Sequence, residues 1–258
     1  MNRIKKFICQ ALCCLFPLSL SAQSGDNSQM LKQANNPLAD IKAFSVHNYY
    51  TPRAYGSSEG MNSMWFRYTQ PVGRVLLRAS LPVNTIPSAE AQATSGLGDF
   101  TMLGAYLLTK PSSSNQIGLG PVITAPTATS TVLGSGKWQA GAALAGYFAG
   151  SNTMQLGFLG IWQHSFAGDA LRQEVNVMTL QPFLMWQLGK GYYLRSTGIA
   201  MLDFENDNYY VPLGLGAGKI IRKDNLVFNL FVEPQYTVYQ SGVNVPRTQI
   251  FIGINTQF

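Results

Sequence analysis

Few residues of this 258-residue chain could act in proton transfer or nucleophilic attack. The two histidines are His47 and His164, and all three cysteines lie within the first 14 residues. Ser165 directly follows His164, so in a regular strand the two side chains point to opposite faces and cannot form a nucleophile–base pair. We therefore expect no enzymatic activity. A membrane-bound hydrolase is the third alternative, and it would need a His and a Ser on one face.

Motifs for phosphate or metal binding are incomplete. Residues 134–138 resemble a phosphate loop, but they lack its upstream glycine and carry Trp138 where a hydroxyl side chain must hold magnesium. The acidic stretch 203–208 lacks the glycine and the distal glutamate of a calcium loop. Glycine-rich residues 214–219 do not have dinucleotide-loop spacing. We predict no cofactor and no metal site.

Charged and amide side chains recur on the polar face of segments whose other face is apolar. Inside a barrel, such charges must be paired or hydrated, because an unpaired buried charge costs several kcal/mol. Two interpretations stay open: a structural salt-bridge network, or the lining of a path for a substrate. The residues that we expect to face the lumen are Arg67, Arg78, Asp99, Arg195, Asp203, Glu233 and Gln235.

These side chains are carried by twelve segments with period-two alternation, separated by turn residues. In residues 226–240, for example, Leu230 and Val232 oppose Asn229 and Glu233. A β-sandwich would show the same alternation. The predicted strands are residues 44–50, 62–70, 74–82, 98–109, 116–125, 137–149, 153–165, 175–188, 191–204, 209–221, 226–240 and 247–258.

The connections favour a closed transmembrane barrel over a sandwich. After residue 22, no apolar run reaches the roughly 18 residues of a spanning helix, and a spanning protein without such helices must be a closed barrel. Every second connection is short, as in outer-membrane barrels, where short turns are periplasmic and long loops are external. An even number of strands then leaves both termini in the periplasm. The predicted fold is an all-β, antiparallel barrel at residues 44–258.

The N-terminus has the pattern of a secretory signal. Arg3, Lys5 and Lys6 precede an apolar run at residues 7–20, and small residues follow before Gln23. We expect residues 1–22 to be a cleaved signal peptide, with a permanent membrane anchor as the alternative. Residues 23–43 then form an N-terminal periplasmic segment that is a candidate plug for the lumen.

Composition agrees with an exported membrane protein. Without the three basic residues of the signal, 15 basic and 12 acidic residues remain, which is no excess of the kind that binds nucleic acid. Charged residues make up 12% of the chain, roughly half the soluble average, whereas 46% are hydrophobic. We expect a location in the outer membrane of a Gram-negative cell.

Two further features suggest contacts with partners. The last residue, Phe258, ends a strand with alternate aliphatic residues and resembles the signal by which the barrel-assembly machinery recognises its clients. Gly214, Gly216 and Gly218 fall on one face of one strand, where glycine often marks a close approach by something else. We predict that the N-terminal segment or a ligand fills the space that these glycines leave.

Several stretches, spread over the chain after the signal, resemble the phenol meta-pathway transporter-like family of outer-membrane barrels. They are residues 35–39, 47–50, 78–84, 95–99, 125–129, 133–139, 165–169, 204–208, 211–219 and 231–236. The resemblance implies passage of hydrophobic or aromatic small molecules. Residues 36–39 (NPLA) are similar to the Asn-Pro-Ala of the N-terminal hatch in fatty-acid channels, with one inserted leucine.

Together these features predict an outer-membrane channel for passive diffusion of small, hydrophobic or aromatic solutes. The expected partners are outer-membrane lipid, the assembly machinery and the solute, and not nucleic acid. A non-conducting structural or adhesion barrel is the alternative. An open lumen would favour the channel, and a packed lumen the structural role.

Overall fold

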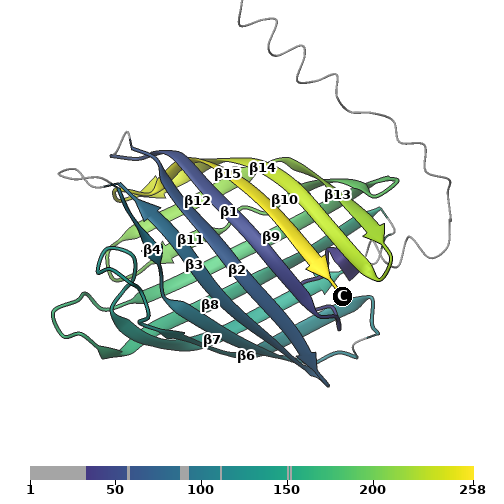
Figure 1. The fold of residues 1–258 in the computed structure, drawn as a ribbon, viewed down its shortest axis with the longest axis horizontal. Helices are drawn as coiled ribbons and strands as arrows, with labels where there is room; N and C mark the ends of the chain where they lie inside the picture. The colour runs from purple at the N-terminus through teal and green to yellow at the C-terminus, as the bar shows by residue number, and fades with distance from the viewer. Residues whose placement is uncertain (1–32, 57–58, 88–92, 111, 150, 152) are drawn as a thin grey trace, which may run out of the picture.

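The computed structural model describes residues 33–56, 59–87, 93–110, 112–149, 151 and 153–258, so the predicted signal peptide lies outside the described residues. The strands form one closed antiparallel barrel (Figure 1). They are β1 (Ala43–Ala54), β2 (Met61–Val72), β3 (Val75–Ile86), β4 (Thr94–Leu97), β5 (Phe100–Leu107), β6 (Asn115–Ala125), β7 (Lys137–Phe148), β8 (Met154–Gly168), β9 (Asn176–Gly189), β10 (Tyr192–Ser196), β11 (Ala200–Asp203), β12 (Asn208–Gly214), β13 (Gly216–Lys223), β14 (Leu226–Ser241) and β15 (Pro246–Gln257).

These fifteen pieces make twelve strands across the barrel, as predicted. The pairs β4–β5, β10–β11 and β12–β13 are each one strand with a short interruption, because both members of a pair join the same neighbouring strand. The barrel closes where β1 pairs with β15. In the central interruption, the Thr197 backbone N–H donates to the Glu233 carboxylate, 2.8 Å away, instead of to a neighbouring strand.

The predicted alternation is confirmed along the strands. In β14, Asn229, Phe231 and Glu233 are buried, whereas Leu230 and Val232 are exposed. Exposed large apolar side chains also cover the outer faces of the other strands, among them Leu119, Ile123, Leu144, Leu156, Trp162, Leu180, Trp186, Ile221 and Ile252. The barrel is therefore apolar outside, and its polar side chains lie inside.

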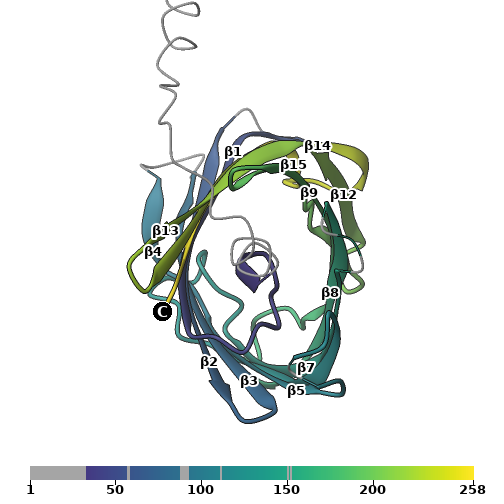
Figure 2. The same ribbon diagram turned by 90° about the vertical axis from the view of Figure 1, so that its right-hand side faces the viewer.

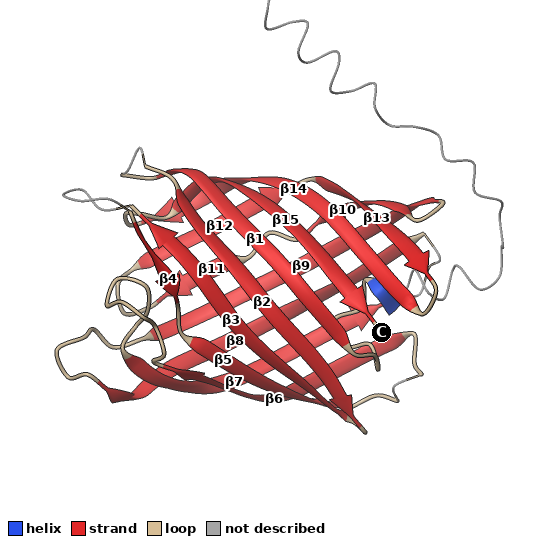
Figure 3. Ribbon diagram, in the orientation of Figure 1, coloured by secondary structure: helices blue, strands red, loops and turns tan. Residues whose placement is uncertain are grey.

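The tightest turns lie at one end of the barrel and the longest connection lies at the other (Figure 3). The end that carries the chain termini has tight turns after β2, β9 and β13. These turns use left-handed backbone at Gly73, Lys190, Gly191 and Asp224, which closes a hairpin in two residues. The other end carries longer loops, of which residues 126–136 form the longest. We call the two ends the terminus end and the loop end.

Residues 33–42 lie inside the terminus end. Figure 2 shows their short helical turn within the ring of strands. Leu38 is only 2% exposed and packs in an apolar cluster on the inner faces of β3, β5, β6 and β7. The cluster also contains Leu76, Leu103, Ala105, Leu107, Val122, Ala143 and Ala145. In the part of the chain that is described, no helix is long and apolar enough to span a membrane.

Candidate functional site

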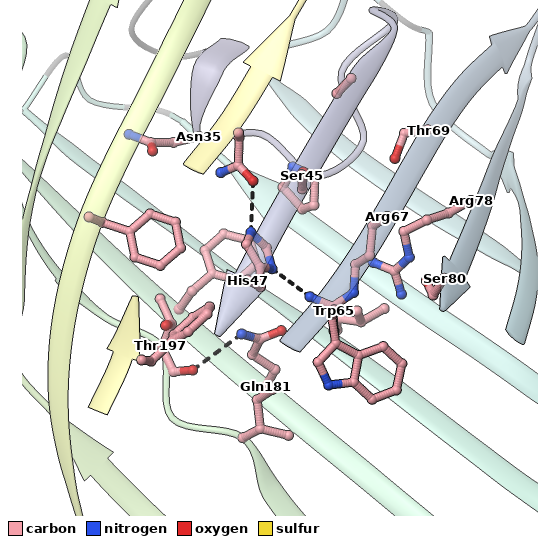
Figure 4. Close-up of a pocket in the computed structure, with 18 of the residues that line it drawn as sticks. Asn35, Ser45, His47, Trp65, Arg67, Thr69, Arg78, Ser80, Gln181 and Thr197 are labelled. Carbon is pink, nitrogen blue, oxygen red and sulfur yellow. Dashed lines mark hydrogen bonds between the residues drawn. The ribbon is translucent and has the colours of Figure 1, made fainter. Parts of the chain in front are cut away.

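The barrel interior holds a cavity of about 530 Å³ between residues 34–41 and the middle of the strands. Its walls are part polar and part apolar, and they are formed by residues of β1, β2, β3, β5, β8, β9, β10, β12, β14 and β15 in addition to the N-terminal segment. Figure 4 shows the polar wall, where side chains of β1, β2 and β3 point toward one another. A volume of this size is within the range of about 300–1,000 Å³ that small-molecule sites in proteins have.

Two arginines of neighbouring strands form the charged part of this wall. In the register of β2 and β3, Arg67 lies opposite Ser80 and Arg78 lies opposite Thr69, so the arginines are diagonal neighbours on the inner face. The Nε of Arg78 is buried and has no hydrogen-bond partner among the described residues. Arg67 and Arg78, two of the seven residues that we expected to face the lumen, both line the cavity.

His47 holds Arg67 in place. Arg67 Nη1 lies 2.5 Å from His47 Nδ1, and His47 Nε2 lies 2.7 Å from Asn255 Oδ1. Because a guanidinium can only donate, Nδ1 accepts, and Nε2 carries the proton that is donated to Asn255. The Arg67 guanidinium also lies over the Trp65 ring, 4.8 Å from its centroid. Among the described residues, no carboxylate forms an ion pair with this arginine.

An aromatic cluster continues the wall beside His47. Tyr49 stacks on Phe251 with ring centroids 4.2 Å apart, and Phe251 meets Phe231 edge to face at 4.8 Å. Trp65 and Ile199 pack against this cluster. All of these side chains line the cavity, so a solute there would contact flat apolar surfaces next to the two arginines.

Arg195 also lines the cavity, but unlike Arg67 and Arg78 it forms an ion pair. Arg195 Nε donates to Glu233 Oε2 at 2.8 Å, and Arg195 Nη2 donates to Thr197 Oγ1 at 2.7 Å. Glu233, which is completely buried, also accepts from the Thr197 hydroxyl at 2.7 Å and from the Gln235 amide at 3.0 Å. The guanidinium lies 3.5 Å from the Phe231 ring centroid. We call Arg195, Thr197, Glu233 and Gln235 the paired network.

The N-terminal segment is hydrogen-bonded to the inner wall at the terminus end. Asn36 Nδ2 donates to Gln116 at 2.8 Å. Asn229 Nδ2 donates to Asn35 Oδ1 at 2.9 Å and to the Ala34 carbonyl at 3.1 Å. Together with the buried Leu38, these bonds fix residues 34–38 across one end of the cavity.

Two of the predicted lumen residues accept hydrogen bonds from loop backbone and do not line the cavity. Asp99, in the interruption between β4 and β5, accepts from the Ser135 backbone at 2.7 Å and from the Ala128 backbone at 3.1 Å. Asp203 ends β11, and its carboxylate accepts from the backbone N–H groups of Glu205 and Asn206. Both carboxylates stabilise connections at the loop end, and neither lines the cavity.

The glycines of β12 and β13 have neighbours other than the predicted ones. A Cβ at Gly218 would overlap the Tyr193 ring, and Cβ atoms at Gly214 and Gly216 would overlap Glu233. The prediction that the N-terminal segment or a ligand fills the space beside these glycines is therefore wrong. The side chains of Tyr193 and Glu233 fill it. The glycines are needed because two bulky inward side chains of β10 and β14 lie against this strand.

A polar cluster at the loop end was not predicted. Lys137 Nζ lies 2.6 Å from Glu174 Oε1, and Ser165 Oγ donates to Glu174 Oε2 at 2.5 Å. These hydrogen bonds, first that from Lys137 and then that from Ser165, hold the pKa of Glu174 below its ordinary value. Ser165 faces inward and is buried, whereas His164 is exposed on the outer face. Among the described residues, no three His, Asp or Glu side chains form a metal-binding group.

Sequence reasoning also missed the role of His47 and Trp65, although period-two alternation could have found both. In β2, Trp65 lies two residues before Arg67 and therefore on the same face. Phe258, the predicted assembly signal, is half exposed, and its backbone N–H donates to the Lys42 carbonyl at 3.1 Å.

No protein-family model matches the sequence, and no curated protein matches it significantly. Solved structures do match. The COG4313 outer membrane channel from Pseudomonas putida F1 is similar with a TM-score of 0.65 at 14% identity, over 92% of this chain and 100% of that chain. The NanC porin has a TM-score of 0.53 at 11% identity, over 83% and 98% of the two chains. The KdgM porin has a TM-score of 0.52 at 11% identity, over 84% and 99%. The chain therefore has the fold of outer-membrane barrel channels and porins.

Proposed function

We propose that this protein is an outer-membrane channel through which small hydrophobic or aromatic molecules diffuse passively. The observation that carries the proposal is the cavity of about 530 Å³ in the barrel interior, lined by Trp65, Phe231, Phe251 and Ile199. The apolar outer face of the strands suits contact with lipid. The resemblance to the phenol meta-pathway transporter-like barrels supports the same class of solute.

We infer that residues 33–42 close the terminus end of the lumen and that this end faces the periplasm. Leu38 and the amides of Asn35 and Asn36 hold the segment against the wall. Passage then requires the segment to move away from the wall. Because several hydrogen bonds and one buried leucine fix it, the motion is a release of a docked segment and not an unfolding of strands.

Swelling of proteoliposomes tests the proposal. The vesicles should contain the mature full-length chain, and the isosmotic solutes should be phenylalanine and glutamine, which are zwitterions that cross lipid slowly. We expect faster swelling than in empty liposomes for both solutes, and faster swelling with phenylalanine than with glutamine. Rates equal to those of empty liposomes would contradict a channel.

The packing of Leu38 and its cluster favours a second candidate, a non-conducting structural barrel whose lumen is closed permanently. Swelling by the intact chain and by a chain that lacks residues 23–41 together separate the two candidates. A channel gated by this segment should swell faster after the deletion. For a structural barrel, the intact chain should remain as impermeable as lipid.

A further inference from the structure

We propose that Arg67 and Arg78 form a binding site for a small aromatic anion, with a carboxylate or sulfonate group on a flat apolar body. This inference rests on the proposed function, because it names the solute class that the lumen would select. It depends on three observations: unpaired cations, a fixed orientation for one of them, and an aromatic wall beside them.

The charge of the cavity wall is uncompensated. Within the described ranges the two ion pairs are Lys137–Glu174 and Arg195–Glu233, and neither includes Arg67 or Arg78. The described residues that line the cavity include no Asp or Glu. Two guanidinium groups therefore face the same cavity without a counter-charge among the described residues, a situation that strongly favours an anionic occupant.

The spacing of the two arginines suits one oxyanion group. Diagonal neighbours on antiparallel strands begin roughly 7–8 Å apart, and arginine side chains reach across that distance to a shared ligand. Arginine recognises carboxylates through parallel N–H donors. Of the five N–H donors of Arg67, one is used by His47, and Trp65 holds the plane of the group. The buried Nε of Arg78 has no partner in the described structure.

The remainder of the wall selects an aromatic body over a sugar. Trp65, Phe231, Phe251 and Ile199 surround the cavity beside the arginines. Stacked and edge-to-face contacts between aromatic rings are favourable, whereas the hydroxyl groups of a sugar acid would lose hydrogen bonds to water against these side chains. We therefore favour an aromatic acid over a hydrophilic acid of equal charge.

Calorimetric titration of the full chain in detergent tests the site. The probes are benzenesulfonate as the aromatic anion, benzyl alcohol as its neutral counterpart, and galacturonate as a hydrophilic acid. The wild-type protein should bind benzenesulfonate at least about tenfold more tightly than benzyl alcohol, since one charge-assisted hydrogen bond contributes about that factor. It should also bind benzenesulfonate at least about tenfold more tightly than galacturonate, because contacts between aromatic rings are gained and the hydroxyl groups of the sugar acid lose hydrogen bonds to water.

The Arg67→Gln and Arg78→Gln variants should each weaken benzenesulfonate binding about tenfold or more and leave benzyl alcohol binding within about twofold. Arg53→Gln, at an exposed arginine of β1, is the matched control and should change nothing. Arg67→Lys and Arg78→Lys keep the charge, so they should bind with intermediate affinity. If a glutamine variant fails to fold, the affinity of the corresponding lysine variant for benzenesulfonate still tests the site.

The proposed site would be overturned if both glutamine variants bound benzenesulfonate as tightly as the wild type. It would also be overturned if the wild type bound galacturonate as tightly as benzenesulfonate. The swelling assay reports on passage separately. Binding without swelling would refute the channel but leave the site, whereas swelling without selective binding would refute the site but leave the channel.

Discussion

The lumen contains arginines in two opposite situations. Arg195 belongs to the paired network, where Glu233 and Thr197 accept its hydrogen bonds and Phe231 covers its face. Arg67 and Arg78, on the β2–β3 side, have no acidic partner in the described structure and border the cavity. In the first arrangement a carboxylate compensates the charge of the arginine, although Arg195 also lines the cavity. The second leaves charge facing the space where a solute would be.

Arginine therefore has two different roles in this lumen. A buried charge next to a complete set of partners stabilises one arrangement of the strands around it, here the interrupted strand β10–β11. A charge beside a cavity can be hydrated, so it needs no partner in the protein and remains available for an anion. Variants at the two sites should therefore differ in both the size and the kind of their effects.

The largest effect is expected from Glu233→Gln, which leaves Arg195 buried without a counter-charge. Loss of one member of a buried pair costs about 3–5 kcal/mol of unfolding free energy. Urea-induced unfolding in detergent, followed by tryptophan fluorescence, would measure the loss. The control is Glu205→Gln in the exposed turn after β11, which should unfold like the wild type. A Glu233→Gln protein as stable as this control would show that the network is not structural.

A smaller effect is expected from Leu38→Ala, which removes the leucine that anchors the N-terminal segment. Truncation of a buried leucine costs about 2–5 kcal/mol, and here the loss weakens the docking of residues 33–42 and not the barrel itself. Proteoliposomes should swell faster, while heat-induced unfolding on gels stays unchanged. If swelling does not increase, the segment does not control passage.

Arg78→Gln should have little effect on stability, in contrast with Glu233→Gln. Among the described residues, Arg78 has no carboxylate to leave behind, and its buried Nε has no partner to lose. We expect the free energy of unfolding to change by less than about 1 kcal/mol, in either direction. Unfolding in urea, as above, would measure it. A loss as large as that of Glu233→Gln would mean that Arg78 is structural.

The smallest effect concerns pH at the loop end. The hydrogen bonds from Lys137 and Ser165 lower the pKa of Glu174, so the carboxylate stabilises its loop above the ordinary glutamate value of about 4.3. This contribution is lost as the pH falls through the lowered pKa. Proteolysis of residues 169–175 should therefore increase only under acid conditions. Glu174→Gln should remove that pH dependence, and an unchanged profile in this variant would contradict the assignment.

Much of the fold could be predicted from the sequence. Inward and outward residues alternate strictly in a barrel, so twelve strands and the inward positions of Arg67, Arg78, Arg195 and Glu233 follow from period-two patterning. Alternation gives only the face on which a side chain lies. It does not give the register between strands, and register decides that Arg195 meets Glu233 whereas Arg78 lies diagonal to Arg67.

The glycines of β12 and β13 illustrate the same limit. Their common face was evident from the sequence, but Tyr193 and Glu233 fill their space from β10 and β14 because the strands on both sides bring these side chains there. Likewise, Asp99 and Asp203 fall near strand ends, where loop backbone competes for a carboxylate. Alternation by itself could not distinguish them from residues that line the cavity.

The most direct test of the unpaired arginines is the charge selectivity of flux. Reversal potentials in planar bilayers can be measured under gradients of sodium benzenesulfonate and of phenyltrimethylammonium chloride, whose aromatic ions are similar in size and opposite in charge. The account predicts that benzenesulfonate passes and phenyltrimethylammonium is excluded. It also predicts that Arg67→Gln with Arg78→Gln abolishes this difference, whereas Arg53→Gln retains it. Equal permeability of the two aromatic ions in the wild-type protein would contradict the account.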